Sequence, residues 1–137
     1  MPVSKETLDE NDPIETVLDL QRQGKVRFIG MSNFSVAQMR EARSAARNKI
    51  VSNQVRYSLA ARDIERDVLP FCQQSNVTVI AYSPLANGMG NLRAAVRGGA
   101  LSKVAEATGR TEAQVALNWC VSKENVIAIP KSDSTER

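Results

Sequence analysis

The sequence predicts an α/β fold, with a parallel β-sheet flanked by helices. Short apolar runs typical of strands alternate with segments whose apolar residues recur at helical spacing. Regular alternation of this kind is typical of parallel strands joined by helical crossovers. Polar residues also follow each apolar run, as they do where such sheets bind ligands. The spacing leaves two architectures open, an open sheet and a segment of a closed barrel.

The chain is expected to form one domain that follows a short flexible segment. Residues 1–11 are mostly polar, so we expect them to be flexible and the domain to cover residues 12–137. Asp12 and Pro13 are the residue types of an N-cap and a first helical position. Gly24 is a residue type that ends helices, so the first helix is predicted to end before it.

Four apolar runs predict four strands. They cover residues 26–31, 50–55, 77–82 and 125–130. Ser35 and Asp63 open the helices that follow the first two runs, and Pro70 is expected to kink the second of these helices. The run at 77–82 is uninterrupted and partly β-branched, which favours a strand covered on both faces. Pro130 ends the last strand because proline has no N–H to donate.

The connection between the third and fourth strands is predicted to contain a loop and two helices. Residues 87–99 are rich in Gly and Asn, so we expect an irregular loop there. The helix after this loop is predicted to end at Gly109. Thr111, followed by Gln114 at the third helical position, forms the pattern of a capping box and predicts the start of the last helix.

Polar side chains gather where the predicted strands end. They are Ser32, Asn33, Asn53, Gln54, Tyr82, Ser83, Lys131 and Ser132. Because the carboxyl ends of parallel strands meet at one edge, we expect these eight side chains to converge. Their hydroxyl and amide groups match a carboxamide, and Lys131, Ser132 and Arg137 offer donors for a phosphate, so the set indicates a nucleotide. Taken singly, each is also typical of turns and helix caps, and that alternative stays open.

Composition argues against several classes of function. The net charge of +3 is spread along the chain and aromatic residues make up 4%, which does not fit a nucleic-acid-binding surface. The lack of histidine and of any CxxC pair argues against a metal site. Cys72 and Cys120 lie among apolar residues, so we expect buried thiols in a reducing compartment. No segment has the roughly 20 apolar residues of a membrane span, so we expect a cytoplasmic protein without a membrane partner.

Five motifs in unbroken order resemble the aldo-keto reductase family. The matching stretches are GKVRFIGMSNF at 24–34 (GKVRxIGVSNF in the family), NQVRYS at 53–58 (NQVEYS), AYSPL at 81–85 (AYSPL), TEAQVALNW at 111–119 (TPAQVALRW), and IPKS at 129–132 followed by Arg137 (IPKSxxxxR). The agreement of all five motifs in order and spacing makes this resemblance more specific than any single motif.

The resemblance implies a (β/α)8 TIM-barrel fold that binds NADP(H). This chain would supply the fourth helix and strands five to eight, so we expect a partial barrel with about four parallel strands. By motif position, Ser32, Asn33 and Gln54 are implied to hold the nicotinamide carboxamide. The other implied contacts are Tyr82 stacked on the nicotinamide ring, Ser83 and Leu85 along the pyrophosphate, and Lys131, Ser132 and Arg137 on the 2′-phosphate, which favours NADP(H) over NAD(H).

The resemblance also implies that the catalytic residues belong to the other half of the barrel. The family's catalytic Asp, Tyr, Lys and His lie in that half, and this chain contains no histidine. Tyr82 matches the family's stacking tyrosine and not its catalytic one. We therefore expect no catalytic residue among residues 1–137 and no activity of the chain alone, since carbonyl reduction needs a positioned proton donor.

Three functions remain open. The chain is a truncated or split aldo-keto reductase that needs another chain for catalysis, a non-catalytic NADP(H)-binding or interaction module, or a non-functional remnant. Four strands without closure leave two open edges and an uncovered apolar face. We therefore expect a homodimer, a complex with a complementary half-barrel chain, or poor folding.

Overall fold

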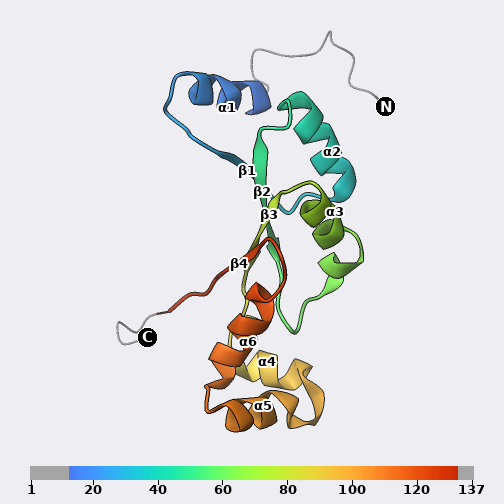
Figure 1. Ribbon diagram of the computed structural model, residues 1–137, viewed down its shortest axis with the longest axis vertical. Coiled ribbons are helices and arrows are strands. Elements are labelled where there is room, and N and C mark those ends of the chain that lie inside the picture. Colours follow the sequence, from blue (N-terminus) through green and yellow to red (C-terminus); the bar gives the residue numbers. More distant parts are fainter. Residues whose placement is uncertain (1–12, 133–137) are drawn as a thin grey trace.

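Strands and helices alternate along residues 13–132, the part of the chain that the computed structural model describes. In order, the elements are α1 (Pro13–Arg22), β1 (Ile29–Ser32), α2 (Val36–Ala45), β2 (Ile50–Arg56), the 3-10 helix η1 (Asp63–Arg66), α3 (Val68–Gln74), β3 (Thr78–Tyr82), α4 (Met89–Ala95), the 3-10 helix η2 (Arg97–Gly99), α5 (Ala100–Thr108), α6 (Glu112–Val121) and β4 (Val126–Ile129). The strands form one parallel sheet in the order β1-β2-β3-β4 (Figure 1). The predicted α/β class is confirmed, whereas the flexible segment 1–11 and the N-cap at Asp12 lie outside the described residues.

One face of the sheet, here called the outer face, carries the main apolar core. Its buried side chains are Asn53, Val55, Val79, Ala81 and Val126, and Met31 and Ala128 on the same face are partly buried. The buried apolar members pack against Met39 of α2 and against Leu69 and Cys72 of α3. Figure 1 shows these two helices on the same side of the sheet. The outer face is therefore part of the hydrophobic core, covered by α2 and α3.

The opposite face, here called the inner face, is formed by the alternate residues of the same strands. It consists of Gly30, Ser32, Ser52, Gln54, Arg56, Thr78, Ile80, Tyr82, Ile127 and Ile129. Within the described residues it is only partly covered, and Ile127 and Ile129 are 49% and 44% exposed. Ile80 is partly buried. The prediction that residues 77–82 form a strand covered on both faces is therefore wrong for the inner face of this chain.

The helix starts follow the predicted capping signals. Ser35 accepts a hydrogen bond from the Gln38 backbone N–H, and the Gln38 side chain accepts one from the Ser35 N–H. Thr111 and Gln114 form the same reciprocal pair at the start of α6. Gly109 ends α5 with a φ of 63°, a left-handed conformation that glycine adopts without strain. Local chemistry thus fixes where these helices begin and end.

The predicted loop at residues 87–99 is wrong, because α4 and η2 occupy most of it. Glycine and asparagine are poor helix formers, but Leu92 of α4 is fully buried against Leu101 of α5 and Ala116 of α6. Burial in this three-helix cluster overrides the low helix propensity of the segment. Figure 1 shows α4, α5 and α6 packed together at one end of the molecule.

Two other boundaries differ from the prediction. The first strand begins at Ile29 rather than at residue 26. The helix predicted to start at Asp63 and kink at Pro70 is two helices, η1 and α3, separated at Asp67. A continuous helix would bring the Pro70 ring against the carbonyl of Arg66, four residues earlier. The break at Asp67 removes that clash, and the Asp67 carboxylate accepts a hydrogen bond from the N–H of Val68.

Candidate functional site

The C-terminal ends of β1 and β2 bring three predicted site residues together. Ser32 and Gln54 are register partners on the inner face. Asn33 follows with a φ of 59°, and its N–H donates to the Gln54 carbonyl at 2.8 Å. The Asn33 amide donates to the Ser32 hydroxyl, whose Oγ lies 3.4 Å from the Gln54 carbonyl oxygen. The Gln54 side chain lies on the inner face, because it alternates with that of Asn53. Its amide makes no hydrogen bond within residues 13–132, so both its NH2 group and its carbonyl oxygen are available.

Tyr82 extends the same edge from the next strand. It is the last residue of β3, partly buried, and is the register partner of Arg56 on β2 and of Ile129 on β4. Its side chain therefore lies on the inner face, the same face as that of Gln54. Its hydroxyl has no hydrogen-bond partner among the residues that the structure describes.

The turn after β3 holds Ser83 and Leu85 in different settings. Ser83 adopts a φ of 50°, and its hydroxyl donates to the Asn87 side-chain oxygen at 2.7 Å. Leu85 packs against the cluster formed by α4, α5 and α6. The turn is thus tied to the three-helix cluster, which fixes its position at the end of β3.

The remaining predicted residues follow β4. Lys131 and Ser132 are exposed and come directly after Pro130, at the same end of the sheet as Tyr82. Arg137, the third predicted phosphate contact, lies outside the described residues. The structure therefore places seven of the predicted residues beyond or at the carboxyl ends of the strands, and Gln54 two positions before the end of β2.

Asn53 does not join the other strand-end residues, and its predicted convergence is wrong. It points to the outer face, is fully buried, and its amide donates to the Phe34 carbonyl at 3.0 Å. The Phe34 N–H donates back to the Asn53 side-chain oxygen at 3.3 Å. Because side chains alternate along a strand, Asn53 and Gln54 have to face opposite ways. Asn53 therefore anchors the turn between β1 and α2.

A glycine brings β1 and β2 close together on the inner face. A Cβ placed on Gly30 would lie 2.3 Å from the hydroxyl oxygen of Ser52, its register partner. That distance is far inside van der Waals contact. The Ser52 hydroxyl can take this position because residue 30 has no side chain.

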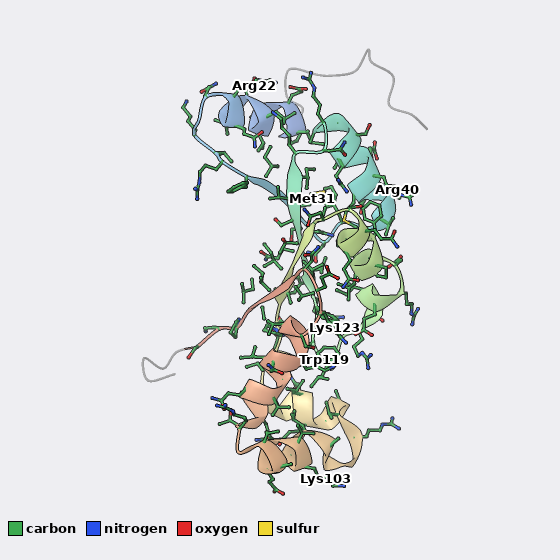
Figure 2. The ribbon with its side chains drawn as sticks, in the orientation of Figure 1. Arg22, Met31, Arg40, Lys103, Trp119 and Lys123 are labelled. Atoms are coloured by element: carbon green, nitrogen blue, oxygen red, sulfur yellow. The ribbon has the colours of Figure 1, made fainter. Side chains whose placement is uncertain are left out.

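The buried titratable groups outside the inner face are structural. The Tyr57 hydroxyl donates to Glu65 at 2.7 Å, and Trp119 stacks at 5.2 Å from the Tyr57 ring. Burial and this hydrogen bond raise the pKa of Tyr57, while hydrogen bonds from Arg62 lower the pKa of Glu65. Figure 2 shows Trp119 next to Lys123, whose ammonium lies 5.5 Å from the ring centroid. These groups satisfy one another and hold η1 against α6.

The two cysteines are free and buried, as predicted. Burial raises the pKa of Cys72 and of Cys120 to about 11. In residues 13–132 no group of three or more acidic, Cys or His side chains is arranged to hold a metal ion. Within the same residues, no helix is both long enough and apolar enough to cross a membrane.

Sequence reasoning missed two charged residues near the site, Arg56 and Asp63. Both line a cavity behind the ends of β1 and β2, together with Asn33. Arg56 was detectable in the sequence, because it lies two residues after Gln54 on a strand and therefore on the same face. Asp63 was not, because its position depends on how the β2–η1 connection folds.

The fold and the polar strand ends together define a class of protein. A parallel sheet with helices on its outer face is consistent with a segment of a (β/α) barrel, a fold in which ligands bind at the carboxyl ends of the strands. Residues 6–137 match the model of the aldo/keto reductase family, so the chain belongs to that family. Its relatives have the TIM-barrel fold, and the predicted partial barrel with four parallel strands is confirmed.

Three relatives illustrate the similarity. The chain is 42% identical over 123 residues to methylglyoxal reductase YeaE of Escherichia coli, covering 86% of this chain and 43% of that protein. It is 33% identical over 124 residues to the NAD(P)H-dependent 6'-deoxychalcone synthase of Glycine max, covering 90% and 38%. A crystal structure of a Klebsiella pneumoniae aldo/keto reductase with NADP and acetate superposes with a TM-score of 0.79 at 39% identity, covering 90% and 44%. The chain thus spans less than half the length of these relatives.

Proposed function

We propose that this chain is the NADP(H)-binding half of an aldo-keto reductase-type oxidoreductase. The observation that carries the proposal is the pair of unengaged polar groups on the inner face, the Gln54 amide and the Tyr82 hydroxyl, beside Ser32 and Asn33. Relatives support it, because two solved Klebsiella pneumoniae structures of 39% identity contain NADP or NADPH.

The donor set fits the nicotinamide end of the cofactor. A carboxamide has one acceptor and two donors, and Ser32, Asn33 and Gln54 offer hydroxyl and amide groups that match both. The Tyr82 ring offers a flat surface for stacking, and Ser83 and Leu85 would line the pyrophosphate. When bound, the cofactor supplies the hydride, and the residues of this chain bind and orient it.

The phosphate end of the cofactor would be held after β4. Lys131 and Ser132 offer a cationic and a hydroxyl donor there, and Arg137 adds a planar donor pair. Such donors stabilise the 2′-phosphate, which NAD(H) lacks. This set therefore favours NADP(H).

We further propose that residues 1–137 bind the cofactor without reducing a carbonyl by themselves. In the family the catalytic tetrad lies in the other half of the barrel, and this chain has no histidine. The activity would require a chain that supplies that half. A non-catalytic NADP(H)-binding or interaction module is the second candidate, favoured by the same binding residues, and a non-functional remnant is the third.

The open edges of the sheet support association with another polypeptide. Strands β1 and β4 lie at the two edges, and Ile127 and Ile129 are exposed on the inner face. Pairing with a second copy, or with a complementary half barrel, would cover both. Sedimentation is expected to show an associated species, and a compact, cooperatively folded monomer would contradict this part of the proposal.

The free thiols of Cys72 and Cys120 support a reducing location such as the cytoplasm. Fractionation of the source cells, with detection of the chain, tests this location.

The central experiment is a titration of the pure chain with NADPH, followed by the fluorescence of the cofactor, with and without a carbonyl substrate. We expect binding without turnover. Lys131→Ala should weaken NADPH binding about tenfold, since a hydrogen bond to a charged group contributes roughly 1.5–3 kcal/mol. Lys103→Ala, on α5 and far from the sheet in Figure 2, is the matched control and should leave binding unchanged.

The outcomes separate the candidates. Turnover by the chain alone would overturn the assignment of catalysis to another half. Binding that never leads to turnover, even with a complementary half barrel added, favours the non-catalytic module. No binding of NADPH, with Lys131→Ala indistinguishable from the parent, favours the remnant.

A further inference from the structure

The turn between β3 and α4 contains the dipeptide Asn87–Gly88, and both residues are exposed. Asn87 is the only asparagine of the chain that precedes a glycine. Glycine has no Cβ, so its backbone nitrogen can approach the preceding side chain with little steric hindrance. The surroundings of Gly88 are open as well, because a Cβ placed there would have no atom within 4 Å. The main chain can therefore reach the side chain of Asn87.

The backbone of this turn adopts conformations that are uncommon for residues with a side chain. Ser83, Ala86 and Asn87 have φ values of 50°, 55° and 59°. Left-handed conformations of this kind are unfavourable when a Cβ is present, although asparagine tolerates them better than most residues. The Gly88 N–H donates to the Leu85 carbonyl at 3.0 Å. Opening of this hydrogen bond frees the Gly88 nitrogen and is favoured by the release of strain in the turn.

A neighbouring hydroxyl activates the Asn87 amide. Ser83 Oγ donates to the side-chain oxygen of Asn87 at 2.7 Å. A hydrogen bond to this oxygen makes the amide carbon more electrophilic and stabilises the negative charge that forms when a nucleophile adds. The turn thus supplies a nucleophile, an electrophile and a donor to the developing charge.

We propose that Asn87 is a site of spontaneous deamidation and that this reaction weakens the binding of NADP(H). The Gly88 nitrogen forms a bond to Cγ of Asn87, the bond from Cγ to Nδ2 breaks, and ammonia leaves with the proton of the Gly88 N–H. The product is a succinimide ring. One water molecule then opens the ring at either carbonyl and gives aspartate or isoaspartate. The net reaction consumes one water and releases one ammonia, without oxidation or reduction.

The effect on the cofactor rests on the proposed function, in which Ser83 lines the pyrophosphate. Either product puts a carboxylate in place of the amide that accepts from the Ser83 hydroxyl. A charged acceptor binds this hydroxyl more strongly than an amide oxygen does, so Ser83 is held away from the cofactor. The new negative charge also repels the pyrophosphate. The affinity for NADP(H) therefore falls as the chain ages.

The first measurement detects the modification without any ligand. The full chain is incubated in mildly alkaline buffer, tandem mass spectrometry follows the conversion of amide to carboxyl at each asparagine, and an isoaspartate-specific methyltransferase identifies isoaspartate. Asn76 is the internal control, because it is also exposed with a φ of 52° but precedes Val77, whose branched side chain hinders attack. We expect Asn87 to react at least about tenfold faster than Asn76. The rate should rise with pH, since the attacking nitrogen has to lose its proton.

The second measurement compares NADPH binding before and after this incubation. The affinity of the parent should fall about fivefold, and Asn87→Asp should bind about fivefold more weakly than the fresh parent at low ionic strength, with a smaller difference at high salt. Asn87→Gln forms the corresponding larger ring far more slowly, so it should bind as the fresh parent does and keep its affinity. Asn76→Gln is the matched control variant and should lose affinity as the parent does.

Reaction of Asn87 at the rate of Asn76 or below would overturn the site. Unchanged NADPH affinity in Asn87→Asp, or equal losses in incubated parent and Asn87→Gln, would overturn the effect on the cofactor. The mass measurement uses the unmodified chain, so it decides the site even where a variant does not fold. No binding of NADPH by the fresh parent would count against the proposed function and the effect on the cofactor together, while the mass measurement would still decide whether Asn87 reacts.

Discussion

The two faces of the sheet come from the same strands but have opposite surroundings. On the outer face Asn53, Val79 and Ala81 are fully buried under helices. On the inner face their chain neighbours Gln54 and Ile80 are only partly buried, and Ile127 of β4 is half exposed. One residue along a strand therefore separates a core position from a position on the partly covered inner face. Burial in this chain thus differs between the two faces of each strand rather than between one strand and the next.

The largest expected effect is the difference in alkylation rate between the buried native thiols and an exposed thiol. Burial raises the pKa of Cys72 and Cys120 to about 11, so at pH 8 their reactive thiolate fraction is roughly a hundredfold or more below that of an ordinary thiol with pKa about 8.5. Alkylation of the folded chain should be slow and should accelerate as the pH rises toward 11.

A thiol placed on the inner face supplies the control for that experiment. In the variant Ile127→Cys the new side chain takes a position that is half exposed, so it should be alkylated at an ordinary rate. Mass spectrometry after timed labelling resolves the three sites. Fast labelling of Cys72 in the native chain would show that the outer face is not covered in solution.

The variant Asn53→Leu tests the polar anchor of the outer face. It leaves the N–H and the carbonyl of Phe34 without their side-chain partners in a buried place. Each unsatisfied group costs about 1–3 kcal/mol, so the free energy of unfolding should fall by about 3 kcal/mol. Urea denaturation measures the change. Gln54→Leu, one residue away on the inner face, should change it by less than about 0.5 kcal/mol.

A pair of alanine substitutions compares the apolar residues of the two faces. Val79→Ala empties a fully buried position and should lower the free energy of unfolding by about 2 kcal/mol. Ile127→Ala removes more atoms but from a side chain that is 49% exposed, so a monomer should lose less than about 1 kcal/mol. A larger loss for Ile127→Ala would mean that another polypeptide covers the inner face.

The smallest effect concerns ligand binding without a change in stability. Gln54→Ala should weaken NADPH binding by about tenfold, the free energy of one or two hydrogen bonds, and leave the unfolding midpoint unchanged. Fluorescence titration and urea denaturation of the same sample report the two quantities. Equal NADPH affinity in parent and variant would remove Gln54 from the proposed cofactor site.

Structural features that depend on a few neighbouring residues could be predicted from the sequence. The capping pair Thr111–Gln114 and the terminating Gly109 place helix ends where the structure has them, because the hydrogen bonds and dihedral angles involved are local. The order of strands, and the gathering of Ser32 and Tyr82 at one edge, follow from the parallel topology alone. The family resemblance added the barrel, which periodicity left open.

The predictions that were wrong concern features that depend on residues distant in the sequence. Helix α4 contains Gly90 and Asn91 and forms because Leu92 finds a buried place against helices later in the chain. The break at Asp67 lies three residues before the proline that causes it. The orientation of Asn53 was in principle readable from strand alternation, but its partner, the Phe34 backbone, was not.

Because Gly30 lies close to Ser52, residues 30 and 52 are expected to vary together among homologous chains. An alanine at residue 30 would require the hydroxyl of Ser52 to turn away from its present position. Homologous chains that gain a side chain at residue 30 are therefore expected to keep a small residue at position 52. Such paired changes would alter the side chains on the inner face and leave the backbone hydrogen bonds of the sheet intact.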